Sequence, residues 1–303
     1  MIAHFAIAAT ALLGCGRRAE DLLPKGAPVP ERVLSPIPKF SETLPEALDW
    51  RWVNGTVFTS RVGYQLLPSP CGSCWAFAAT GALSDRVKIA TKGRLVDFSI
   101  SPQALLDCAK DAGTCNGGNP NLAYHYAATV GLPDETCLPY RGMDNSNWGE
   151  SPCAERLCRR CDRFGSCNFV PRNATPAIQV AEYGSVTGVA AMKAEIAARG
   201  PIACLMYAHA DSFEAYTGGV ITDTTRYEGI THVVTVTGWG VDRASGAPYW
   251  VVRNSFGTAW GELGYYRQLM GKDIYNMESH ACAWATPARE STDELMKRSG
   301  VVL

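Results

Sequence analysis

The first half of the chain has the apolar periodicity of buried helices. Between residues 74 and 90 the apolar side chains recur every three or four positions, which predicts one long buried helix. A shorter helix is predicted over 101–108, because Ser101 can cap it and Pro102 suits the first turn. A third helix is predicted over 121–130.

The second half has the pattern of strands. Residues 232–237 form a β-branched run bounded by glycine, 249–253 form a second such run, and 242–246 provide the turn between them. Helices first and strands later predict an α+β fold with two lobes, a helical N-terminal lobe and a β-rich C-terminal lobe. We expect the active-site cleft between the lobes, because such interfaces commonly hold active sites.

The two ends of the chain differ from this globular pattern. Residues 1–15 are mostly apolar and too short for a stable membrane anchor, so they are interpreted as a signal peptide. Residues 16–43 are rich in proline and charge and are interpreted as a short pro-segment or linker. We place the mature folded domain at 44–289 and expect 290–303 to be a polar, frayed tail.

Composition narrows the class of protein. The 12 cysteines favour an oxidising compartment, hence the secretory pathway and a lysosomal, vacuolar or extracellular destination. A net charge of −1 gives no indication of nucleic acid or an anionic membrane as partner. No segment after residue 15 has 18 or more consecutive apolar residues, so no membrane-spanning helix is predicted. Asn54 and Asn173 stand in sequons for glycosylation. Cys158 and Cys161 form a C-x-x-C pair, but no second pair with metal-ligand spacing follows, so no metal or cofactor is expected.

The strongest chemical signal is the run from Cys71 to Trp75, which reads Cys-Gly-Ser-Cys-Trp. It matches the local signature of papain-type nucleophiles. Cys74 would begin the long buried helix, whose positive end stabilises a thiolate. The alternative is that both cysteines of the run are simply bridged.

A thiolate needs a base that is distant in sequence and close in space. His232 opens the apolar strand and is the candidate base, although a strand-end histidine is often only part of the core. Asn254 follows the next strand, and its amide can fix the imidazole tautomer in a Cys-His-Asn triad.

With these motifs the chain resembles the papain-like cysteine peptidases over about residues 44 to 285. The glycines of the Cys115-Asn116-Gly117-Gly118 run and the motif from Asn254 to Tyr265 contribute to the resemblance. It implies that Gln65 is the oxyanion-hole glutamine. It also implies substrate-binding positions along the cleft, which are Gly72, Gly117, Gly118, Leu66 and Trp260.

Within that family the chain is most similar to the carboxypeptidase-type cathepsins. An insertion of three residues lies between Gln65 and Cys71, like the loop that binds the substrate's C-terminal carboxylate in that subgroup. Here Leu66 replaces the loop histidine and offers no donor to a carboxylate, and Arg61 is a hypothetical substitute. Phe256 replaces a tryptophan that shields the histidine–asparagine pair. A carboxypeptidase is therefore predicted, with an endopeptidase as the alternative.

The resemblance also implies disulfides. The 11 cysteines after residue 44 leave ten for five bridges if Cys74 is kept as a free thiol. The implied pairs are Cys71–Cys115, Cys108–Cys137 and Cys204–Cys282, while the group Cys153, Cys158, Cys161 and Cys167 admits three pairings. Cys15 has three interpretations: loss with the signal peptide, a pro-segment cysteine that masks Cys74 as in that subgroup, or a lipoprotein attachment site.

The function predicted from the sequence is peptide-bond hydrolysis through an acyl-enzyme on Cys74, in a monomer that acts on peptides or proteins. A catalytically weak adhesion protein on the same scaffold, or an acyltransferase with the same chemistry, are the alternatives of a different class.

Overall fold

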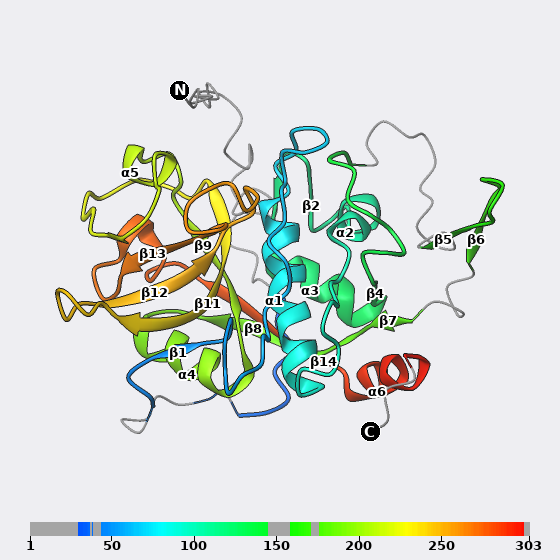
Figure 1. The fold of residues 1–303 in the computed structure, drawn as a ribbon, viewed down its shortest axis with the longest axis horizontal. Helices are drawn as coiled ribbons and strands as arrows, with labels where there is room; N and C mark the ends of the chain where they lie inside the picture. Colours follow the sequence, from blue (N-terminus) through cyan, green and yellow to red (C-terminus); the bar gives the residue numbers. More distant parts are fainter. Residues whose placement is uncertain (1–29, 37, 39–43, 145–157, 171–175, 300–303) are drawn as a thin grey trace.

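The computed structural model describes residues 30–299, apart from 37, 39–43, 145–157 and 171–175. Helices α1 to α3 gather on one side of the molecule and most of the strands on the other (Figure 1). Two separate clusters of buried apolar side chains fill these halves, one around α1 and one inside the strand-rich half. The chain is thus an α+β, two-lobed protein.

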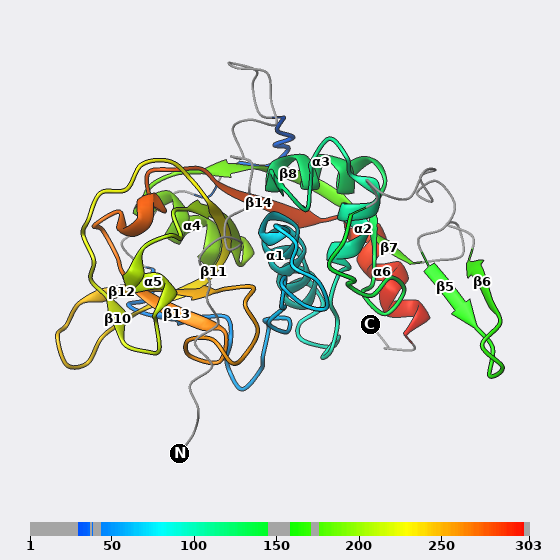
Figure 2. The same ribbon diagram turned by 90° about the horizontal axis from the view of Figure 1, so that it is seen from above.

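The helical lobe matches the predicted pattern closely. Its helices are α1 (Cys74–Ala90), α2 (Pro102–Cys108) and α3 (Pro120–Thr129). Ser101 caps α2 by accepting a hydrogen bond from the Ala104 amide, as its position predicts. Short strand pairs join them: β2 (Gly113–Thr114) with β3 (Gly117–Gly118), and β4 (Leu132–Pro133) with β7 (Ala177–Ile178). The hairpin of β5 (Cys158–Cys161) and β6 (Cys167–Val170) projects from this side of the molecule (Figure 2).

The other lobe is built on one mixed sheet in the order β10-β13-β12-β11-β9-β14-β8, with β1 also paired to β11. The strands are β1 (Leu48–Asp49), β8 (Val180–Val186), β9 (Ile202–Met206), β10 (Val220–Ile221), β11 (His232–Val241), β12 (Pro248–Arg253), β13 (Tyr265–Leu269) and β14 (Cys282–Pro287). Helices α4 (Val189–Arg199) and α5 (Asp211–Glu214) and the 3₁₀ turn η4 (Ile274–Asn276) accompany them.

Strand β11 continues past the glycines that were expected to bound it. At Gly238 an added Cβ would lie 2.0 Å from the Leu48 carbonyl oxygen, so β1 can pair with β11 only where the side chain is absent. Glycine therefore permits a close strand crossing here.

The prediction of a frayed tail was wrong. Helix α6 (Arg289–Arg298) follows β14 directly, and it buries Thr292 and Met296. The segment is polar on most of its surface, but one apolar stripe is sufficient to dock a helix.

Candidate active site

Cys74 is the first residue of α1 and is fully buried. The turn before it is fixed from the neighbouring chain, because the Gly72 amide donates to the Cys115 carbonyl at 2.7 Å. Trp75 is bound to the same neighbouring segment, since its indole N–H donates to the Thr114 carbonyl at 3.1 Å. The sulfur therefore sits at the positive end of a long, well-held helix, where a thiolate would be stabilised.

The expectation of a free Cys74 thiol was wrong for this state of the chain. Cys74 is disulfide-bonded. The predicted set of five bridges that leaves Cys74 free is therefore wrong for this state. One of the three interpretations of Cys15 is that it masks Cys74 by a disulfide. Cys15 lies outside the described residues.

The other disulfides are partly as predicted. Cys71–Cys115 and Cys204–Cys282 are present. The predicted Cys108–Cys137 bond is wrong, because Cys137 is bonded to Cys158 at the start of the β5–β6 hairpin, with their Cα atoms 4.4 Å apart. The hairpin cysteines are thus not a closed group of four, and Cys108 is also disulfide-bonded. The side chains of Cys153, Cys161 and Cys167 lie outside the described part.

The structure brings His232 and Asn254 together, as the spacing of their motifs predicts. His232 begins β11 and Asn254 follows β12, and the histidine Nε2 lies 2.8 Å from the asparagine Oδ1. The same Oδ1 accepts the Ser255 amide at 2.8 Å, which holds the side-chain amide in place. Because Oδ1 can only accept, Nε2 carries the proton and Nδ1 is left as the basic nitrogen.

The basic nitrogen of His232 is buried and without a hydrogen-bond partner among the described residues. Burial lowers the pKa of His232 to about 4, although the hydrogen bond from its ring to Asn254 opposes the shift. In the disulfide-bonded state the ring is therefore neutral at ordinary pH. One nitrogen of this neutral imidazole is fixed and the other is available to accept a proton. The low pKa belongs to the disulfide-bonded state, because a thiolate beside the ring would raise it again.

Aromatic rings enclose the pair. The Phe256 ring lies 5.1 Å from the His232 ring, between centroids, and Trp260 packs edge-on against Phe256 at 5.8 Å. Phe213, on α5, contacts both the histidine and Trp260. The smaller phenylalanine thus still contributes to a shield that keeps water from the histidine–asparagine bond.

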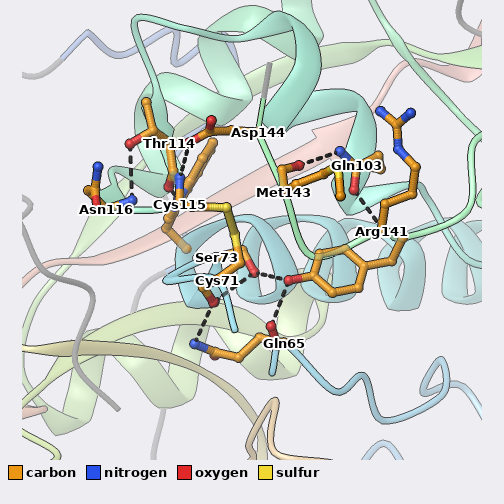
Figure 3. Close-up of a disulfide and its surroundings, with 12 residues drawn as sticks. Gln65, Cys71, Ser73, Gln103, Thr114, Cys115, Asn116, Arg141, Met143 and Asp144 are labelled. Atoms are coloured by element: carbon orange, nitrogen blue, oxygen red, sulfur yellow. Dashed lines mark hydrogen bonds between the residues drawn. A yellow bond between two sulfur atoms is a disulfide. The ribbon is translucent and has the colours of Figure 1, made fainter. Parts of the chain in front are cut away.

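Gln65 is fully buried and is fixed on both sides of its side-chain amide. Its Nε2 donates to the Cys71 carbonyl at 3.3 Å, and its Oε1 accepts from the Ser255 hydroxyl at 2.7 Å (Figure 3 shows Gln65 with Cys71). The Tyr140 hydroxyl donates to the Gln65 carbonyl at 2.8 Å and lies 2.7 Å from the Ser73 hydroxyl. Burial raises the pKa of Tyr140 to about 12, so it remains a donor.

Ser255 and Tyr140 were not among the predicted site residues. Ser255 stands next to Asn254 within its motif, so a signal was present in the sequence. Tyr140 has no motif, and its contact with Gln65 spans 75 residues.

The predicted substrate positions occupy different settings. Gly117 and Gly118 form β3 and are buried, and an added Cβ at Gly118 would lie 2.3 Å from the Trp75 ring. Gly72 is buried beside them, and Trp260 is partly exposed next to Phe256. Leu66 is half-buried.

The loop of residues 66–70 carries an exposed Leu67 and no cation. Arg61, the hypothetical substitute, is paired with Glu135 at 2.5 Å, so its charge is already engaged. A cavity of about 400 Å³ is lined by Leu67 of this loop and by Asn254 and Ser255.

Other predictions fall outside this cluster. Asn54 is exposed in a turn, as a glycosylation acceptor must be, whereas Asn173 lies outside the described residues. No group of three or more histidine, cysteine or acidic side chains that could hold a metal ion occurs among the described residues. Within the same part of the chain, no helix is long and apolar enough to cross a membrane.

Comparison with known proteins identifies the family of the chain. The family model of the papain family cysteine proteases matches residues 44–285. A cathepsin Z of Onchocerca volvulus is 41% identical over 256 residues, covering 81% of this chain and 79% of the relative. A cathepsin B-like cysteine proteinase 6 of Caenorhabditis elegans is 34% identical, covering 70% of this chain and 59% of the relative.

Solved structures show the same fold. A digestive procathepsin L 3 from the larval midgut of Tenebrio molitor has a TM-score of 0.65 at 27% identity, covering 83% of this chain and 73% of that structure. The chain belongs to the papain family of cysteine proteases. It is a papain-like cysteine peptidase, which acts on peptide bonds of peptides or proteins.

Proposed function

We propose that Cys74 is the nucleophile, His232 the general base and acid, and Asn254 the residue that orients the imidazole. The observation that carries this proposal is the state of His232: Nε2 is bonded to Asn254 at 2.8 Å, and Nδ1 is buried without a partner. In the reduced enzyme Nδ1 takes the thiol proton. The thiolate then attacks the scissile carbonyl, and the imidazolium returns the proton to the leaving amine.

Gln65 supplies one of the two oxyanion donors in this proposal. Its Nε2 points to the Cys71 carbonyl beside the helix start, and the Cys74 amide is the second donor. Ser255 holds the other end of the same amide. Hydrolysis of the acyl-enzyme by water then frees Cys74.

The disulfide on Cys74 makes the described state an inactive precursor. A sulfur engaged in a disulfide cannot attack a carbonyl, so activation requires its reduction or exchange. We propose that residues 1–15 are a signal peptide and 16–43 a pro-segment that is removed at about residue 44. The disulfides fit an oxidising compartment of the secretory pathway, where the exposed Asn54 would be a glycosylation acceptor.

We further propose that the enzyme removes residues from the C-termini of peptides. The 66–70 loop stands next to Gln65, and this insertion would narrow the cleft on the side of the leaving group. Gly117 and Gly118 would bind the acyl side of the substrate along the backbone of β3. Leu66 and Trp260 would contact the leaving residue.

The alternative is an endopeptidase, and two observations favour it. Leu66 has no donor for a terminal carboxylate, and Arg61 is engaged by Glu135. Because residues 66–70 contain no cation, this loop would block longer substrates only by its bulk.

One peptide in two forms, with a free C-terminal acid and with a C-terminal amide, separates these two activities. The reduced enzyme is incubated with each form at acidic pH, and the products are followed by mass spectrometry. Stepwise loss of C-terminal residues from the acid form supports the carboxypeptidase, and internal cuts in both forms support the endopeptidase. The variant Leu66→His should raise the preference for the acid form by about ten- to a hundredfold, because a charge-assisted hydrogen bond is worth about 1.5–3 kcal/mol. Leu67→His, one position further on, is the control.

A further inference from the structure

Strand β8 forms one of the two edges of the large sheet, and part of the N-terminal segment lies along it. The Arg32 amide donates to the Tyr183 carbonyl at 2.8 Å, and the Tyr183 amide donates back to the Arg32 carbonyl at 2.8 Å. This is one antiparallel step of strand pairing. The segment is drawn in dark blue beside β8 in Figure 2.

Glu182 holds the same segment two residues further on. Its Oε2 accepts the Leu34 amide at 3.0 Å and the Ser35 amide at 2.8 Å, and its Oε1 accepts the Ser35 hydroxyl at 2.8 Å. Arg199 of α4 donates to the same hydroxyl at 3.3 Å and lies 3.8 Å from the carboxylate. The carboxylate is thus nearly saturated by groups of this one segment.

Apolar packing contributes little to this contact. Leu34 is 68% exposed and Val33 is 40% exposed. Val33 only approaches the bare backbone of Gly184, where an added Cβ would lie 3.3 Å from its methyl group. The segment is therefore bound to β8 mainly by hydrogen bonds to the charged Glu182 carboxylate, which are about twice as strong as bonds between neutral groups.

This contact lies away from the strand that carries His232. Two strands, β14 and β9, separate β8 from β11, which carries His232. The contact therefore does not depend on the active-site residues.

We infer that the β8 edge, with Glu182, is a docking site that retains residues 31–35 of the N-terminal segment independently of the disulfide on Cys74. The inference rests on the proposed function in one respect, that this segment is a pro-segment. Its consequence is that the segment stays bound at β8 after cleavage near residue 44, so cleavage and release are separate steps.

Hydrogen exchange of the full chain, both unreduced and as the inactive Cys74→Ser variant, which lacks the disulfide at this position, tests this docking site. Protection of the amides of residues 32–35 should persist in Cys74→Ser, and its loss there would contradict retention independent of the disulfide. The measurement also compares the wild type with Glu182→Gln. The variant should exchange the amides of residues 32–35 and of Tyr183 about tenfold faster, because the charged acceptor is lost. Glu46→Gln is the matched control, since Glu46 is an exposed carboxylate nearby in the sequence, and it should leave these rates unchanged.

A second variant guards against a general loss of folding. Arg32→Pro removes the donor to Tyr183 on the segment itself and leaves the catalytic domain intact. It should speed exchange at residues 33–35 and at Tyr183 while β11 and β12 keep their protection. Rates within twofold of the wild type in both Glu182→Gln and Arg32→Pro would overturn the inference. Because the measurement uses the inactive precursor, failure of the proposed peptidase chemistry would not alter its result.

Discussion

The bond between Ser255 and Gln65 allows a specific test of the oxyanion hole. The Ser255 hydroxyl donates to the Gln65 Oε1 at 2.7 Å, and both groups are buried. In Ser255→Ala the amide oxygen loses this donor, so the Gln65 side chain is no longer fixed at that end. The neighbouring donor, Nε2, then spends less time at the position where negative charge develops.

The size of the effect can be bounded. Removing an oxyanion donor outright costs about 10²–10³ in kcat. Ser255→Ala keeps the donor and loses one neutral hydrogen bond, worth about 0.5–1.5 kcal/mol, so kcat should fall by about three- to tenfold. KM should change by less than about twofold, because the interaction is made chiefly in the transition state.

Steady-state kinetics on a peptide substrate give both constants for the reduced enzyme. Thr237→Val is the control, since it removes a buried hydroxyl bond to the Val251 carbonyl on the same sheet but away from the site. An unchanged kcat in Ser255→Ala, together with a loss of unfolding free energy like that of the control, would refute the reasoning and leave Ser255 a structural residue.

Three further outcomes are expected. The buried Arg253 guanidinium lies 3.0 Å from the Asp85 carboxylate. Asp85→Ala removes this partner and should lower the free energy of unfolding by about 3–5 kcal/mol in denaturant titration. A loss below about 1 kcal/mol would contradict this. Gly118→Ala should lower the free energy of unfolding by about 1–3 kcal/mol in the same assay, since the new methyl group would overlap the Trp75 ring. An unchanged denaturation midpoint would show that the Trp75 ring does not restrict this position. Protonation of His232 should lower the free energy of unfolding of the unreduced chain by about 3 kcal/mol as pH falls from 6.5 to 4, because its folded-state pKa, about 4, is below the unfolded value. In His232→Gln the fall in unfolding free energy over this pH range should be smaller by that amount. An equal fall in both proteins would show that the ring is not buried in its neutral form.

Local patterns sufficed for the parts of the site that lie within single elements. The helix at Cys74 has both the signature and the apolar spacing, and Ser101 begins the next helix with its own cap. His232 and Asn254 stand at the ends of two strands that a short turn joins, so their meeting follows from the hairpin.

Contacts between distant segments could not be predicted in this way. Ser255 reaches Gln65 across 190 residues, and Cys137 reaches Cys158 instead of Cys108 because the hairpin places it there. The polar composition of the tail hides the single buried stripe, including Met296, by which α6 packs against the domain. The disulfide of Cys74 involves a partner that parity alone cannot assign.

The most direct test of the account is the reactivity of Cys74 before and after mild reduction. The full chain is treated with a thiol-directed inhibitor in both states, the labelled peptide is identified by mass spectrometry, and peptide hydrolysis is measured in parallel. We predict no label on Cys74 and no hydrolysis before reduction, then label on Cys74 and hydrolysis after it, with Cys74→Ser inactive throughout. Hydrolysis by the unreduced chain, or by Cys74→Ser, would contradict the assignment of Cys74 as a masked nucleophile.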